Sequence, residues 1–198
     1  MVKYGFIMVT LIAFIAFYST QDTFRMSTTF FSMLKYTSVV AITGLGITFA
    51  MAVGGLDLSV GAVAGMSVTL SAMTMVIYDK SAPVAVGVVL LAGLLIGCLN
   101  AFLIVGLKIP DLLATLASMF AIMGLKLVPV RGRSVSSGMM MEDGTNAKGK
   151  FTDGFLKIDN GSFGPIPFAV IMWLVLTIAC WLFLTRTTWG RAMYAVGS

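Results

Sequence analysis

The sequence predicts an all-α fold, a polytopic transmembrane bundle of about six membrane-crossing helices. Of its 198 residues, 59% are hydrophobic and 11% are charged, whereas soluble domains are about 45–50% apolar and about 25% charged. In addition, long stretches without any charged residue recur along the chain. A helix needs about 20 apolar residues to cross a hydrocarbon core about 30 Å thick. These observations argue against a soluble enzyme and against a disordered chain.

Six charge-free stretches mark the expected crossings: 4–21, 36–56, 58–78, 81–107, 112–125 and 160–185. The first follows Lys3, and a basic residue before an apolar run is also typical of a secretory signal peptide. Residues 17–22, however, lack the small-x-small pattern of a cleavage site. We therefore expect the first helix to be retained.

The next three stretches are separated by short polar breaks. Only Asp57 lies between the second and the third. Asp79, Lys80 and Pro83 mark a turn before the fourth. A short polar hinge at 106–111 precedes the fifth.

The fifth stretch has only 14 residues before Lys126. A lysine side chain reaches back toward the membrane surface, and the apolar run 127–130 extends the crossing. The sixth helix is expected to begin near Pro165. Between these two crossings lies the long polar segment 131–164, which is more typical of a functional or mobile loop than of a simple connection. A short hairpin is expected near 150–158.

The basic residues do not predict the orientation that we adopt below. With a cytoplasmic N-terminus and six crossings, the cytoplasmic ends carry four basic residues: Lys3, Lys108, Arg186 and Arg191. The opposite side carries nine: Arg25, Lys35, Lys80, Lys126, Arg131, Arg133, Lys148, Lys150 and Lys157. This distribution runs against the positive-inside rule.

Composition also narrows the chemistry. The chain has no histidine, which excludes histidine-based triads, metal sites and general bases. Cys98 and Cys180 lie within apolar runs, where cysteine acts as a small hydrophobic residue. The net charge of +5 is scattered at the ends of apolar runs and in one loop, so no nucleic-acid partner is predicted. We expect no catalytic residue and no metal site.

Asp57 is the most conspicuous polar residue. It interrupts about 40 uncharged residues in the motif GGLDLSVG at 54–61, and a carboxylate near a membrane is costly unless it is paired, hydrated or protonated. One interpretation is a broken helix beside a translocation path. The other is a tight turn in which Asp57 and Ser59 cap the third helix.

Small and polar residues inside the expected spans have simpler interpretations. Gly61 and Gly65, like Gly93 and Gly97, are spaced four apart, which favours close helix packing. Asn100 is expected to form hydrogen bonds between helices, with lining of a pathway as the alternative.

Three segments resemble the ribose and simple-sugar (branched-chain amino acid permease-like) family of ABC-transporter inner-membrane permeases. The first is GGLDLSVGAVAGMS at 54–67. The second is NAFLIVGLKIP at 100–110, followed by LATL at 113–116. The third is TRTTWGRAMYAVG at 185–197. Asp111, Leu112 and Leu113 depart from the family pattern, which often has two apolar or aromatic residues there.

The resemblance implies a permease subunit in the bacterial cytoplasmic membrane that carries a simple sugar and performs no bond chemistry. It implies three protein partners: a second permease subunit, a cytoplasmic ABC ATPase and an extracytoplasmic binding protein. ATP and magnesium belong to the ATPase, and this chain itself binds no cofactor. The resemblance also implies two sets of site residues. The translocation-path signature comprises Gly54, Gly55, Asp57, Ser59, Gly61 and Asn100. The ATPase-coupling segment comprises Arg186, Gly190, Arg191, Tyr194 and Gly197.

The resemblance also sets topology and extent. The coupling segment implies a cytoplasmic C-terminus, and six crossings then place the N-terminus in the cytoplasm and the loop 131–164 outside. Family members have roughly ten crossings, so residues 1–198 are expected to form one permease domain that is incomplete at its C-terminus.

Two other classes of function remain open on the sequence. One is a secondary transporter or channel that uses Asp57 as an ion or proton site, in which an Asp57→Asn change would abolish ion dependence. The other is a fragment that assembles with permease partners without moving a substrate.

Overall fold

The computed structural model describes residues 5–141 and 144–197, so Lys3 and Ser198 lie outside the described part of the chain. The described residues are mostly helical, which confirms the all-α prediction. The helices are α1 Gly5–Thr20, η2 Asp22–Arg25, α2 Ser27–Ala52, α3 Val60–Ala72, η3 Met73–Ile77, α4 Ala82–Ala101, η4 Phe102–Gly106, α5 Asp111–Leu125, α6 Asp153–Asn160, α7 Phe168–Arg186 and α8 Thr188–Gly197. The strands β1 Ser162–Phe163 and β2 Ile166–Pro167 pair in antiparallel fashion.

Four helical stretches are long and apolar enough to cross a membrane: Ser27–Ala52, Val60–Ile77, Ala82–Gly106 and Phe168–Arg186. Two of them are α-helices that continue into a π-helical turn, α3 into η3 and α4 into η4. The shorter apolar helices α1 and α5 coincide with the expected first and fifth crossings. A span shorter than the hydrocarbon core is accommodated by local thinning of the bilayer.

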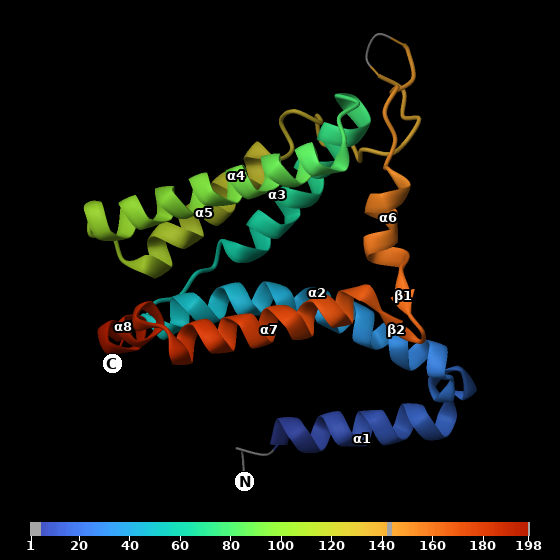
Figure 1. Ribbon diagram of the computed structural model, residues 1–198, viewed down its shortest axis with the longest axis horizontal. Coiled ribbons are helices and arrows are strands. Elements are labelled where there is room, and N and C mark those ends of the chain that lie inside the picture. The colour runs from blue at the N-terminus through green and yellow to red at the C-terminus, as the bar shows by residue number, and fades with distance from the viewer. Residues whose placement is uncertain (1–4, 142–143, 198) are drawn as a thin grey trace.

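The helices form two groups and one separate member (Figure 1). α2 and α7 lie side by side along most of their length, and α3, α4 and α5 pack together above them. α1 lies apart on the other side of the α2–α7 pair. Successive long helices run in opposite directions. One end of the bundle therefore gathers the α2–α3 and α4–α5 connections and α8, while the other gathers α6, β1 and β2.

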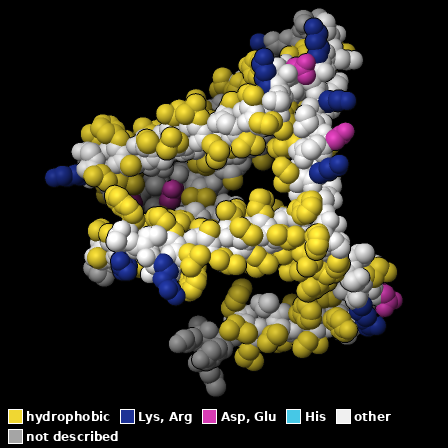
Figure 2. All heavy atoms as spheres, viewed as in Figure 1, with side chains coloured by type: hydrophobic (Ala, Val, Ile, Leu, Met, Phe, Trp, Pro, Cys, Tyr) yellow, Lys and Arg dark blue, Asp and Glu magenta, His cyan; other side chains and the backbone are white. Residues whose placement is uncertain are grey.

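Many large apolar side chains of this chain face outward (Figure 2). Phe6, Val105 and Val196 are 83%, 77% and 77% exposed, and α1 buries none of its residues. Several of the most deeply buried side chains are instead polar: Ser38, Ser59, Thr74, Asn100, Thr115 and Ser118. An apolar exterior around hydrogen-bonded polar groups matches lipid rather than water as the surrounding medium. The chain is a multi-pass membrane protein.

The structure corrects the expected hairpin near 150–158. Residues 153–160 form the helix α6, and the only hairpin of paired strands in the described chain is β1–β2 at 162–167. The physical reason lies in the turn residues. Gly164, at a φ of +61°, and Pro165 form the tight connection between the strands, whereas Asp153 and Lys157 complement the two ends of the α6 dipole.

Several expected helix boundaries also move. α2 begins at Ser27, nine residues before the charge-free stretch, because Lys35 is accommodated by an ion pair with Asp159 at 2.9 Å. α7 begins at Phe168 rather than near Pro165. The run 127–130 forms turns instead of extending α5.

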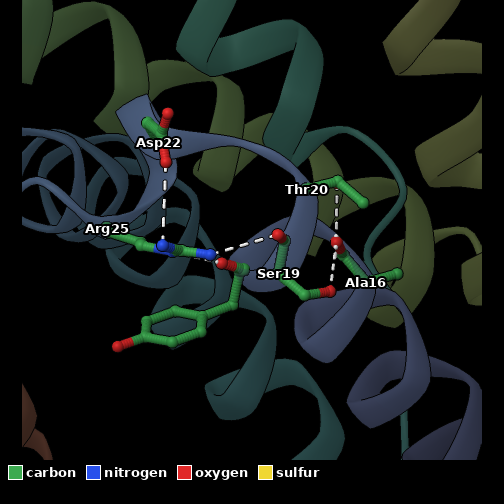
Figure 3. A network of polar contacts seen from close by, with 6 residues as sticks. Ala16, Ser19, Thr20, Asp22 and Arg25 are labelled. Carbon is green, nitrogen blue, oxygen red and sulfur yellow. Dashed lines mark hydrogen bonds and ion pairs between the residues drawn. The ribbon is translucent and has the colours of Figure 1, made fainter.

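Arg25, at the end of η2, reaches back to the end of α1 (Figure 3). Its guanidinium donates hydrogen bonds to the carbonyl oxygens of Tyr18 at 2.7 Å and Ser19 at 3.1 Å. It also lies 3.6 Å from the Asp22 carboxylate and over the Tyr18 ring. A cation that bonds the last carbonyls of a helix stabilises its C-terminus. Arg25 therefore fixes where α1 ends.

The loop 131–164 is anchored on the end of α3. The Gly149 N–H donates to the carbonyl oxygen of Val76 in η3 at 3.2 Å. A Cβ at Gly149 would collide with the carbonyl oxygen of Met75, and Met75 and Val76 are fully buried. Glycine is therefore required at this contact.

Candidate functional site

The three segments that carry the family resemblance meet at one end of the bundle. The first forms the α2–α3 connection, the second forms the end of α4 and the start of α5, and the third ends in α8. In Figure 1 these elements gather at the end where the chain terminates. Segments far apart in the sequence therefore build one site.

A cavity of about 400 Å³ lies among these segments. Its walls combine backbone, carboxylate, amide and hydroxyl groups with apolar side chains. The lining residues are Ala50, Val53, Gly54, Gly55, Leu56, Asp57, Asn100, Ile104, Ile109, Pro110, Asp111 and Thr115. No lysine or arginine is among these described lining residues.

A chain of hydrogen bonds runs from α5 to Asp57. The Ser118 hydroxyl donates to the Asn100 side-chain oxygen, and the Asn100 amide donates to the Ser59 hydroxyl oxygen at 3.0 Å. The Ser59 hydroxyl and backbone N–H then donate to one carboxylate oxygen of Asp57, at 2.6 and 2.8 Å. Because Ser59, Asn100 and Ser118 are buried, each must find such partners within the protein. The network holds α3, α4 and α5 together behind the cavity.

The hydrogen bonds of Ser59 test the second interpretation of Asp57, in which Asp57 and Ser59 cap the third helix. Ser59 occupies the position before α3, but its hydroxyl caps no helix N–H and donates to Asp57 instead. The prediction that Ser59 caps the third helix is therefore wrong. Asp57 turns the chain locally through its bonds to Ser59, and it also lines the cavity.

The backbone of Leu56 is held by the first turns of α5. The Leu56 N–H donates to the Asp111 carboxylate at 2.6 Å, and the Thr115 hydroxyl lies 3.4 Å from the Leu56 carbonyl oxygen. Lys108, at a φ of +56°, turns the chain so that Pro110 and Asp111 face this segment. Asp111 lies just before the charge-free stretch 112–125. The hydrogen bond from the Leu56 N–H holds the pKa of the Asp111 carboxyl below its ordinary value.

α8 lies at the end of α7, and its last residue contacts the α2–α3 connection. The Gly190 N–H donates to the Thr187 hydroxyl at 3.0 Å, which caps the first turn of α8. A Cβ at Gly190 would collide with the carbonyl oxygens of Phe183 and Leu184. At its other end, Gly197 lies against Gly54, which has a φ of +79° and would carry a Cβ 3.3 Å from the Gly197 Cα.

The structure brings together most, though not all, of the residues predicted for the path. Gly54, Gly55, Asp57 and Asn100 line the cavity, and Ser59 lies directly behind it. Gly61 does not line it, and no atom lies within 4 Å of where its Cβ would be.

The glycine pairs expected to pack helices behave differently. No neighbouring atom lies within 4 Å of a Cβ built at Gly61, Gly93 or Gly97 among the described residues. Only Gly65 meets a neighbour, the ammonium of Lys126. The predicted close packing is therefore not made within the described chain.

The predicted coupling residues are spread over α7 and α8. Gly190 and Gly197 make the close contacts described above, whereas Arg191 and Tyr194 are exposed on α8. The Arg186 guanidinium lies 6.0 Å from the centre of the Trp181 ring at the end of α7.

Sequence reasoning missed Thr115 and Ser118. They lie three residues apart in an otherwise apolar helix and therefore share one face, a signal that could have been read. Asp111 was noted in the polar hinge and as a departure from a pattern, but its partner Leu56, 55 residues away, was not predicted. Among the described residues, no three His, Cys, Asp or Glu side chains cluster in a way that could hold a metal ion.

Comparison with known proteins places these features in a family. Residues 29–198 match the family described as "Branched-chain amino acid transport system / permease component". No solved structure matches the chain.

Three curated relatives illustrate the similarity. The ribose import permease protein of Haemophilus influenzae is 31% identical over 166 residues, which are 84% of this chain and 48% of that protein. The autoinducer 2 import system permease protein of Salmonella typhimurium is 31% identical over 159 residues, 80% of this chain and 45% of that protein. The ribose import permease protein of Escherichia coli is 28% identical over 193 residues, which are 96% of this chain and 56% of that protein. The chain thus spans about half the length of the curated relatives it matches.

Proposed function

The chain belongs to the family of permease components of the branched-chain amino acid transport type, and we propose that it serves as a permease subunit of an ATP-binding-cassette importer for a simple sugar. The observation that carries the proposal is the convergence of residues 54–57, Asn100 and Asp111 around one cavity of mixed polar and apolar lining, with Gly197 of α8 in contact with Gly54. Two of the relatives above are named as ribose import permeases, which supports the choice of substrate class.

The lining of the cavity suits a neutral, hydroxyl-rich solute. Its volume of about 400 Å³ lies in the range of small-molecule sites. The carboxylates of Asp57 and Asp111 and the side-chain oxygen of Asn100 accept hydrogen bonds from hydroxyl groups. The lack of lysine and arginine among the described lining residues disfavours an anionic substrate. The cavity would then form part of the path.

The permease would act by alternating between two conformations. ATP and magnesium would be held by a partner ATPase, whose cycle biases one conformation over the other. α8 would receive the movement of the ATPase. It would pass that movement to the cavity through its last residue, Gly197, which lies against the lining residue Gly54. No bond is made or broken by this chain in such a cycle.

Partners and location follow from the same proposal. The α8 end of the bundle would face the cytoplasm of a bacterial cell and dock the ATPase. The loop 131–164, with α6 and the β1–β2 hairpin, would face outward and meet a substrate-binding protein. A second permease subunit would pair within the cytoplasmic membrane. Both termini would then be cytoplasmic, as the alternating direction of the helices allows.

The proposal is tested by purifying the tagged chain from membranes and reconstituting what accompanies it. We expect an ABC ATPase, identified by mass spectrometry, to co-purify, and vesicles with the complex and its binding protein to take up labelled ribose only with ATP. Gly190→Val should release the ATPase, because the side chain would collide with the end of α7. Membrane insertion should remain intact.

Gly44→Val is the matched control, because nothing lies within 4 Å of a Cβ at Gly44. It should keep the ATPase at the unmodified level. Equal ATPase recovery with Gly190→Val would contradict the role of α8. Uptake driven by a sodium or proton gradient without ATP would contradict the importer itself and favour an ion-coupled carrier.

A further inference from the structure

The segment Val53–Asp57 has no regular secondary structure, yet the structure holds it in one place. α2 ends at Ala52 and α3 begins at Val60. The N–H groups of residues 53–55 donate back to carbonyl oxygens of α2, and the remaining backbone groups need other partners. Those of Leu56 find them on α5: the N–H donates to Asp111 at 2.6 Å, and the carbonyl oxygen lies 3.4 Å from the Thr115 hydroxyl. The two backbone polar groups of Leu56 thus face side chains that lie one helical turn apart on α5.

Neighbouring residues leave room for this contact. A Cβ at Gly55 would lie only 3.2 Å from the same Asp111 oxygen, so glycine lets the carboxylate approach the backbone closely. The Thr115 hydroxyl is almost completely buried, and its single hydrogen is directed mainly at the Asp111 carbonyl oxygen at 2.8 Å. Its 3.4 Å contact with the Leu56 carbonyl oxygen is therefore the weaker one, and the Asp111 carboxylate makes the stronger contact with Leu56.

We propose that Asp111 is a positioning residue, a carboxylate latch that holds the broken-helix segment 53–57 against α5. Asp111 is also where this segment departs from the pattern that the chain otherwise resembles. The latch joins two parts of the site that no helix connects. Gly197 of α8 rests on Gly54 at one side of the segment, and Asp111 fixes Leu56 at the other. A displacement of α8 is thereby transmitted to the cavity wall through a held segment.

The consequence for transport rests on the proposed function, whereas the latch itself does not. Its test therefore uses the full chain alone in lipid nanodiscs, without ATPase or binding protein. Hydrogen–deuterium exchange is followed in the peptide that contains the Leu56 amide. Asp111→Ala should accelerate exchange there by about ten-fold, as expected for the loss of a hydrogen bond to a charged group.

Graded variants separate the latch from a general loosening of α5. Asp111→Asn keeps an oxygen acceptor of the same size without the charge, so its exchange rate should lie between those of the unmodified chain and Asp111→Ala. Gly55→Ala reaches the same contact from the other side and should also accelerate exchange, because the methyl group displaces the carboxylate. Gly44→Ala, in open space, and Asp22→Ala, at the distant α1–α2 junction, should leave the Leu56 amide unchanged.

The amides of α5 provide the internal reference. They should keep their exchange rates in Asp111→Ala if the carboxylate positions Leu56. An unchanged Leu56 amide in both Asp111→Ala and Gly55→Ala would overturn the proposal. Equal acceleration along α5 and at Leu56 would also overturn it, because Asp111 would then merely stabilise its own helix. Neither outcome depends on transport.

Discussion

At the residue scale, Asn100 is the centre of the buried polar network. Its amide donates to Ser59 on one side, and its oxygen accepts from Ser118 on the other. The amide presents its donor and its acceptor on two separate atoms, so one side chain reaches both neighbours. A hydroxyl donates and accepts through a single atom, and a carboxylate would have no hydrogen to donate to Ser59. This explains why a single polar residue near the end of an apolar helix can hold three helices in register.

We expect Asn100→Ala to lower the free energy of unfolding by about 1–3 kcal/mol, because two buried hydroxyl groups lose their partner. The measurement is equilibrium unfolding of the purified chain in mixed micelles. Asn160→Ala, at the exposed end of α6, is the matched control and should change stability little. Equal stability of the two variants would show that the network is not structurally important.

At the element scale, the sequence argument predicted the helices better than their ends. Charge-free stretches predict crossings because charged groups are costly in hydrocarbon. The same rule placed the start of α2 too late, because it counts Lys35 as a break. In the structure Lys35 pairs with Asp159, which is far away in the sequence. Such a partner is fixed by the tertiary fold and is invisible to a local pattern.

The sequence also predicted only some residues of the candidate site. Asp57 and Asn100 stand out because each is an isolated polar group in an apolar run. Thr115 and Ser118 do not, because small hydroxyl residues are common where membrane helices pack. The contact between Gly54 and Gly197 joins the two ends of the site across most of the chain. No spacing rule predicts it.

The loop 131–164 is anchored on η3 through Gly149, and this anchor leads to a prediction of its own. We expect Gly149→Ala to detach this anchor, because its methyl group would collide with the Met75 carbonyl. The side chains of the neighbouring Lys148 and Lys150 are already exposed, so release of the backbone at Gly149 should make cleavage by trypsin several-fold faster. Gly154→Ala, where a Cβ meets nothing within 4 Å, should be cut at the unmodified rate. Identical cleavage rates would contradict the anchor.

At the scale of the whole molecule, an apolar exterior surrounds an interior in which hydrogen-bonded polar groups lie among apolar side chains, as lipid requires. Orientation is a separate matter, because the basic residues favour the opposite arrangement. In the proposed topology the loop 131–164 faces outward and α8 faces the cytoplasm. A reagent that cannot cross the membrane should therefore reach the loop 131–164 in intact cells but not α8.

A labelling experiment tests this orientation. After replacement of Cys98 and Cys180, a cysteine at Ser137 should react with an impermeant maleimide in intact cells. A cysteine at Ala192, exposed on α8, should react only after the membrane is opened. The reverse pattern would invert the topology and remove α8 as an ATPase contact.

The central claim is that the cavity between residues 54–57, Asn100 and Asp111 belongs to the translocation path. The most direct measurement is the rate at which a cysteine at Ile104, in the cavity wall, reacts with a water-soluble maleimide in the assembled importer. We predict that this rate changes several-fold between nucleotide-free and ATP-bound states and falls when ribose is present. A cysteine at the adjacent Val105, which is exposed and does not line the cavity, should show no such change between the states. A rate at Ile104 that neither nucleotide nor sugar alters would contradict the claim.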